Sequence, residues 1–299
     1  MPLPRSIRFF RLRPGSPVEA RLCQWLGQLA AYSASLDPVR DPIEGIHQLR
    51  LVSKALRAAI RLADGGQPAP DLLRHDRAIR RFAGLVSGAR DAQVHSDLLL
   101  KLGRKQPEAI RTAIELLIRR RKPRTTASNV AIRAVRGVAA EAASLQLLLP
   151  RRIDPVSISM AIRRVHRKTQ GWRERAIEGS IPTDFHAWRR WQKRLEAQLR
   201  LVSTAKTGNP DRLLRDLHVL QEDLGALHDA DELEERLAGN AQWRGITPGI
   251  RHRLLKLVHQ RQRELRRRLV KRSRKVLGSR LRQCCRSTAK AWEKVAPSA

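Results

Sequence analysis

Apolar residues recur along the chain with the spacing of α-helices. In residues 43–63, for example, Ile46, Leu49, Leu56 and Ile60 fall on one face of a helix with 3.6 residues per turn. Gly and Pro clusters separate such segments, and no segment shows the alternation of a β-strand. The pattern predicts an all-α fold, with helices over residues 18–35, 43–63, 71–86, 91–102, 107–122, 131–149, 156–177, 186–204, 211–224, 229–237 and 248–295.

The sequence contains the same pattern of residues twice. Residues 46–61 (IHQLRLVSKALRAAIR) align with residues 185–200 (FHAWRRWQKRLEAQLR), and in both segments a His is followed by Arg, Lys and Arg at matching positions. Downstream and in the same order, residues 86–92 (VSGARDA) align with residues 224–230 (LGALHDA). Two matched pairs at nearly the same offset indicate a duplicated helical unit.

The duplication predicts how the chain is organised. We expect a single domain over residues 1–299, made of two pseudo-symmetric helical bundles, residues 18–149 and 156–295, around a shared basic pore or groove. Asp91 and Asp229 occupy equivalent positions, and we expect both to be N-caps that begin helices.

The composition indicates an anionic partner. The chain has 61 Lys and Arg against 28 Asp and Glu, a net charge of +33, so an anion should neutralise part of the field. Nucleic acid, an acidic membrane surface and an inorganic polyanion all fit this charge. With 41% hydrophobic residues, the chain is too apolar for a disordered basic tail.

Other sequence features narrow the class of protein. Three cysteines cannot form a framework of several disulfides, and there is no apolar stretch of signal-peptide or membrane-span length. We therefore expect a cytoplasmic protein without a membrane span. The sequence contains no Walker A loop, GxGxxG, GxSxG or zinc-ligand spacing, so we expect no cofactor, no metal and no catalytic residue.

The first copy of the repeat carries a stripe of cations beside its apolar face. Its members fall within a sector of about 80° of the helix, about 5–6 Å apart from turn to turn. A row with this spacing suits a ligand with repeating negative charge, although a solvated basic face is the alternative. The stripe consists of His47, Arg50, Lys54, Arg57 and Arg61.

The second copy carries a matching stripe, with one acid in it. Glu196 stands at the position equivalent to Arg57 and can pair with a neighbouring cation, so the second half is expected to bind less strongly. The stripe consists of His186, Arg189, Lys193 and Arg200, reinforced by Arg190 and Arg194.

Neighbouring helices supply further candidates for the same site. These are Arg77, Arg81 and Arg90 in the first half and Arg215 and His228 in the second. For the two histidines that begin the stripes, three roles stay open: contact with a phosphate oxygen, orientation of the adjacent arginine, and metal binding or catalysis.

These blocks of sequence resemble the CHAD family, the conserved-histidine α-helical domain. The resemblance lies in residues 47–62, 86–94, 185–202 and 220–233, in the family's order. It implies a pair of helical bundles around a basic pore and the binding of inorganic polyphosphate. The family's basic positions correspond here to His47, Arg50, Lys54 and Arg57, and to His186, Arg189, Arg190 and Lys193.

Residues and resemblance together give three hypotheses for the function. The first is non-enzymatic binding of polyphosphate in a basic channel, with association with polyphosphate granules. The alternative is non-specific nucleic-acid binding, which the bulk charge favours equally but which lacks a recognition helix and interleaved aromatic residues. The third is an enzyme acting on a phosphate polymer, with His47 or His186 as the phospho-acceptor. The oligomeric state is not indicated by the sequence.

Overall fold

Helices make up the fold of the computed structural model, which describes residues 4–8, 10–86, 88–120, 128–202, 210–239 and 243–295. No β-strand occurs in these ranges, so the predicted all-α class is confirmed. The helices are α1 (Arg5–Arg8), α2 (Val18–Ala34), α3 (Pro42–Ile60), η1 (Ala63–Gly66), α4 (Pro70–Gly84), α5 (Gly88–Gly103), α6 (Glu108–Arg120), α7 (Ser128–Leu148), η2 (Pro150–Arg152), α8 (Pro155–Gly179), α9 (Pro182–Val202), α10 (Pro210–Ala238), α11 (Pro248–Val276) and α12 (Ser279–Glu293).

Several helices begin where the sequence places an acid or a proline. Asp41 and Asp154 cap α3 and α8: their side chains accept hydrogen bonds from the backbone N–H of Glu44, at 3.1 Å, and of Ser157, at 2.7 Å. A proline follows each cap, where its fixed φ and its missing N–H are both tolerated. An acid followed by a proline therefore begins each of these two helices.

Several predicted helix boundaries are wrong; α9, for example, begins at Pro182 and not at residue 186. Residues 211–224 and 229–237 form one continuous helix, α10, so Asp229 lies inside it and is not an N-cap. A single glycine such as Gly225 costs a helix only about 1 kcal/mol, which the packing of its buried leucines outweighs. Asp91 lies inside α5, which already begins at Gly88. The expected last helix is divided at Leu277–Gly278 into α11 and α12.

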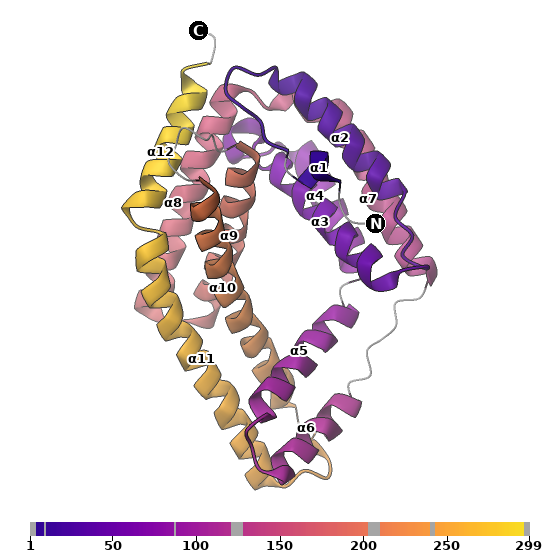
Figure 1. The fold of residues 1–299 in the computed structure, drawn as a ribbon, viewed down its shortest axis with the longest axis vertical. Helices are drawn as coiled ribbons and strands as arrows, with labels where there is room; N and C mark the ends of the chain where they lie inside the picture. Colours follow the sequence, from indigo (N-terminus) through magenta and orange to yellow (C-terminus); the bar gives the residue numbers. More distant parts are fainter. Residues whose placement is uncertain are drawn as a thin grey trace.

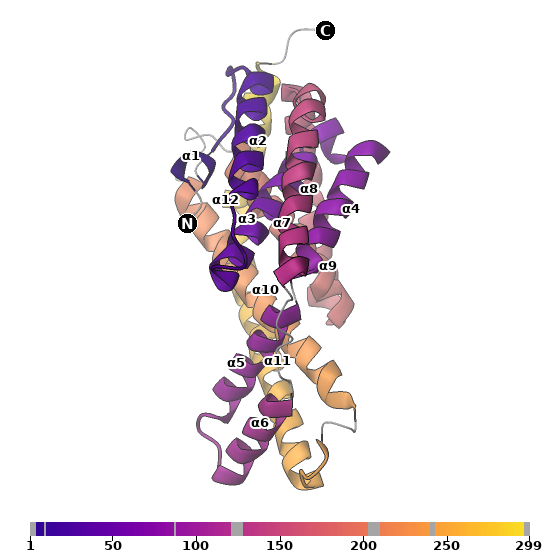
Figure 2. The same ribbon diagram turned by 90° about the vertical axis from the view of Figure 1, so that its right-hand side faces the viewer.

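The helices form an elongated ring (Figure 1). At its upper end, α2 packs against α7, and α4 against α3 and α7; on the other side, α8 packs against α9 and α12. At its lower end, the α5–α6 pair packs against α10 and α11, and Figure 2 shows these helices as a narrower region below the upper one. The long helices α10 and α11 connect the two ends.

Two hydrophobic cores hold the ring. The larger core lies at the upper end and joins helices from both sides of it, with buried residues such as Leu26, Leu56, Trp188, Leu217 and Trp292. The smaller core lies between α5–α6 and α10–α11, with buried residues such as Leu99, Ile114 and Val258. No helix in the described part of the chain is long and apolar enough to cross a membrane.

The two helices with the predicted cationic stripes are neighbours. Helix α3 packs against α9, and η1, which follows α3, packs against α8. The two segments most alike in sequence therefore meet in space. The predicted pseudo-symmetry of the two halves stays a prediction, as do the expected domain bounds.

Candidate functional site: a cationic cluster between two helices

The cationic stripes of α3 and α9 face each other. Arg50, Lys54 and Arg189 lie close enough to Lys193 for their charges to act on its ammonium group. Burial, and then the charges of Arg189, Lys54 and Arg50, lower the pKa of Lys193 to about 7, while Asp229 opposes the change. We call Arg50, Lys54, Arg189 and Lys193 the cationic cluster. Lys54 and Lys193 are equivalent residues of the sequence repeat, as are Arg50 and Arg189.

Toward the C-terminal end of α3, an acid from a third helix joins the cations. Asp76 of α4 accepts a hydrogen bond of 2.9 Å from Nε of Arg57 and one of 3.0 Å from Nη2 of Arg61. Burial lowers the pKa of Arg61 to about 10, although Asp76 opposes the shift, and burial also lowers the pKa of Arg194. The Asp76 carboxylate therefore accepts hydrogen bonds from Arg57 and Arg61, and its charge also acts on Arg194.

The position of Asp76 in the sequence indicates that it has a partner on another helix. Asp76 shares one face of α4 with the buried Leu72 and Ile79, at the i, i+4, i+7 spacing of a helix. An acid on the buried face of an otherwise basic helix indicates a partner on the next element. The first stripe contains no acid of its own, and its counter-charge, Asp76, comes from α4.

At the other end of α9, histidines and acids connect α5, α9 and α10. Nε2 of His186 lies 3.2 Å from Oδ2 of Asp231 and 3.3 Å from Nδ1 of His228, and the two imidazole rings meet edge to face at 4.5 Å. Nε2 of His228 lies 3.3 Å from Glu232, whose other carboxylate oxygen is 3.5 Å from Nε2 of His95. Because a carboxylate only accepts hydrogen bonds, Nε2 of His186 donates to Asp231.

This network fixes the protonation of His228. Burial and then the charges of Arg189, His186, Lys193 and His95 lower the pKa of His228 to about 3, so the imidazole is neutral near pH 7. His228 can therefore contribute hydrogen bonds but no charge to an anion site. Among the described residues, no group of three or more His, Cys, Asp and Glu side chains is arranged to hold a metal ion.

Some of the predicted residues lie outside the cationic cluster. His47 is exposed on α3, and Arg77 and Arg81 are exposed on α4. Nε of Arg77 donates to the backbone oxygen of Leu73 in its own helix, at 3.2 Å, and the guanidinium of Arg81 lies 5.0 Å from the ring centre of its neighbour Phe82. The side chain of Arg90 lies outside the described part of the chain.

The remaining predicted residues lie on α9 and α10. Arg190 is exposed, and its charge acts on Arg194. Arg200 donates to Glu196 at 2.7 Å, and Glu196, only 5% exposed, also lies 3.2 Å from His218. Arg215 is exposed near the start of α10. Glu196, the acid that interrupts the second stripe, thus interacts with Arg200 and His218.

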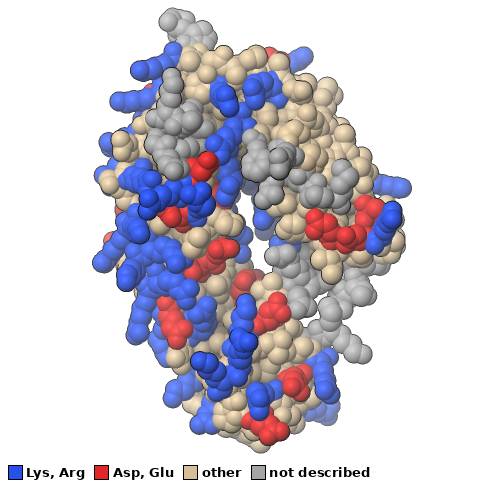
Figure 3. All heavy atoms as spheres, in the orientation of Figure 1, with Lys and Arg blue, Asp and Glu red and all other residues tan. Residues whose placement is uncertain are grey.

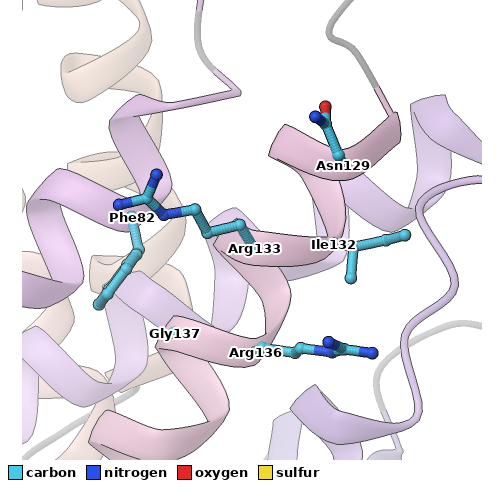
Figure 4. A pocket seen from close by; sticks show the side chains of 6 residues that line it. All are labelled: Phe82, Asn129, Ile132, Arg133, Arg136 and Gly137. Carbon is cyan, nitrogen blue, oxygen red and sulfur yellow. The ribbon is translucent and has the colours of Figure 1, made fainter.

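Two pockets lie near this region. One, of about 150 Å³, is bounded by α3, η1, α4, α8 and α9 and includes Arg61, Asp76 and Arg194. The other, of about 610 Å³, lies between α4 and α7, where Figure 4 shows Phe82 beside Gly137 and the side chain of Arg136 pointing away from them. Only the first pocket contains residues that adjoin the cationic stripes.

Charged side chains are unevenly distributed over the surface. In the view of Figure 3, Lys and Arg gather over the side formed by α11 and α12, with fewer acids among them. The same view shows an opening through the molecule between the two sides of the ring. In Figure 1, α3 and α9 lie at the upper end of this opening.

The fold and the site define an all-helical protein with two facing cationic helices. The CHAD domain family model matches residues 19–238, which is most of the chain, and the chain belongs to this family, which is associated with polyphosphate binding. A solved structure similar to the chain is described as the crystal structure of the CHAD domain from the plant Ricinus communis. It has 18% sequence identity and a TM-score of 0.62, over 93% of this chain and 97% of the other. No curated protein matches the chain.

Proposed function

We propose that this protein binds inorganic polyphosphate at the cationic cluster, without catalysis, and that it does so in the cytoplasm and on polyphosphate granules. The observation that carries the proposal is the meeting of Arg50 and Lys54 with Arg189 and Lys193 across α3 and α9. Like charges held this close repel each other. An anion between them would remove the repulsion.

The form of the site favours a linear polyanion. Cations follow one another at intervals of three or four residues along α3 from His47 to Arg61 and along α9 through His186, Arg189 and Lys193, which matches a ligand with a regular repeat of charge. Arginines can bind phosphate oxygens through two N–H groups, while lysines act as point charges. Membership of the CHAD family supports polyphosphate as this polyanion.

The histidine network has a positioning role in this proposal. Asp231 holds His186 at the start of α9, one helical turn before Arg189. At the other end, Asp76 aligns Arg57 and Arg61. Both ends thus orient cations, and the cationic cluster between them provides the positive charge that binds the ligand.

The test compares two charge reversals of equal size and spacing. The double variant Arg50→Glu/Lys54→Glu changes the cationic cluster, and Arg263→Glu/Arg267→Glu makes the same change on exposed residues of α11. Binding of the full chain to long-chain polyphosphate is measured at about 0.3 M salt, where loose surface attraction is screened. Double-stranded DNA at equal charge concentration provides the second ligand.

The proposal is supported if the wild-type protein and the α11 variant bind polyphosphate at this salt concentration and the α3 variant does not. Equal losses in the two variants would show that the whole basic surface binds any polyanion, and the proposed site would be wrong. DNA bound as tightly as polyphosphate would favour the nucleic-acid hypothesis instead. Release of phosphate from the polymer by the wild-type protein would overturn the non-catalytic part of the proposal.

A further inference from the structure

The pocket of about 150 Å³ next to the cationic cluster is strongly cationic. Three arginines line it, Arg61, Arg164 and Arg194, together with a single acid, Asp76. Three positive charges and one negative charge leave a net charge of +2. The pocket has the volume of several water molecules, at about 30 Å³ each, which is also enough for one tetrahedral phosphate group.

The close approach of η1 to α8 closes one wall of this pocket. Gly66 has a φ of +82°, and a Cβ atom there would lie 3.1 Å from Cα of Ala161 and 3.4 Å from Cδ of Arg164. Only glycine combines this backbone conformation with so short a distance. The turn after α3 therefore lies directly against α8 and confines Arg164 beside the pocket.

The other two guanidinium groups are held in place. The guanidinium of Arg194 lies 4.4 Å from the ring centre of Trp191, a cation–π contact that orients its plane. Arg61 donates through Nη1 to the backbone oxygen of Arg57 at 2.8 Å and through Nη2 to Asp76 at 3.0 Å. Such preorganised donors bind an anion with little loss of side-chain entropy.

The pocket also contains acceptors. Gln198 is only 2% exposed, and its Nε2 donates to the backbone oxygen of Arg61 at 2.6 Å. Its Oε1 is buried without a hydrogen-bond partner, although the residue lines the pocket. A buried acceptor of this kind costs free energy until a donor reaches it. Together with Asp76, it indicates a ligand that has a hydroxyl group as well as negatively charged oxygens.

We propose that this pocket binds the terminal phosphate group of a polyphosphate chain. A terminal phosphate has anionic oxygens for the three arginines and, near neutral pH, a P–OH group that can donate to Gln198 or Asp76. An internal phosphate is joined through oxygen to phosphorus on both sides and has no such hydroxyl. The proposal rests on the proposed function, because the same polymer would extend from this pocket along α3 and α9.

Linear and cyclic short phosphates separate chain ends from internal phosphates. Calorimetric titration of the full chain with linear tripolyphosphate and with cyclic tetrametaphosphate, which has no end, should show at least about tenfold tighter binding of the linear ligand, as expected for one charge-assisted hydrogen bond. In Arg164→Gln this preference should fall to nearly none. Arg167→Gln is the matched control, because Arg167 is exposed on the same helix and does not line the pocket.

Each outcome decides the proposal. Equal binding of the linear and cyclic ligands by the wild-type protein would overturn it, and this result needs no variant to fold. A preference that persists in Arg164→Gln would also overturn it, as would orthophosphate that binds as tightly as tripolyphosphate. Long-chain polyphosphate is titrated in parallel: if it binds while linear and cyclic ligands do not differ, the end site fails and the proposed function stands. If it does not bind, the proposed function fails.

Discussion

Lys193 should take up a proton when polyphosphate binds. In the free protein, burial and three neighbouring cations lower its pKa to about 7. A phosphate chain lying between α3 and α9 would bring negative charge to the ammonium group and raise its pKa toward the ordinary value of about 10.4. The binding reaction would therefore consume protons in a defined range of pH.

The size of this uptake follows from the pKa. At pH 8, a lysine with a pKa of about 7 is protonated in about one molecule in ten, so complete protonation on binding takes up about 0.9 proton. At pH 6 the lysine is already protonated, and the uptake falls to about 0.1 proton. By linkage, affinity should weaken by up to tenfold per pH unit between about pH 7 and pH 10.

Calorimetry in buffers of different ionisation enthalpy measures this number directly. Long-chain polyphosphate is used, because its few chain ends add little titration of their own. The variant Lys193→Arg keeps the charge at every pH and should bind without the uptake at pH 8, which separates Lys193 from the histidines. Equal proton uptake in the variant and the wild type, or no increase from pH 6 to pH 8, would refute the reasoning.

Three further predictions concern stability and affinity. Lys193→Met should raise the melting temperature at pH 6 but not at pH 10. The pKa of Lys193 is lower in the folded than in the unfolded protein, so its charge destabilises the fold below about pH 7, and this destabilisation is lost as the pH rises to about 10. An equal change in melting temperature at pH 6 and pH 10 contradicts this. Glu196→Gln should release Arg200 and tighten polyphosphate binding severalfold, and unchanged affinity in a titration would refute it. Gly137→Ala should lower the free energy of unfolding in urea by about 1–3 kcal/mol, because the new Cβ would overlap the ring of Phe82. An unchanged midpoint would show that the ring moves freely.

The helices could be predicted from the sequence because their signals are local. A repeat of apolar residues near 3.6 and a proline or acid at the start are read within one segment, as at Asp41 and Asp154. That α10 is one continuous helix was harder to predict, since a glycine such as Gly225 can end a helix. The packing of α10 against α11 shows that it does not do so here. Packing between helices, and not the propensity of single residues, decides such cases.

The candidate site could be predicted only in part for the same reason. Members of one stripe, such as Arg50 and Lys54, are related by the helix itself, so their common face follows from their spacing. The counter-charge of Asp76 and the contact of His186 with Asp231 join different helices. The spacing along α4 places Asp76 on the buried face, but no spacing in the sequence tells which residues these acids contact. Arg77, predicted from its basic neighbours, proves to be exposed on α4.

The acids at the two ends of the cationic stripes explain where binding energy would come from. Asp76 partly neutralises the cations at one end, and Asp231 holds His186 at the other. In between, the charges of three cations disfavour the protonated form of Lys193 and one acid, Asp229, favours it, so the net effect on Lys193 is repulsion. Repulsion destabilises the free protein and is relieved by a bound anion, which strengthens binding by the same free energy. An anion that spans the cluster gains this free energy, whereas an anion on the exposed cations of α11 gains only a screened surface attraction.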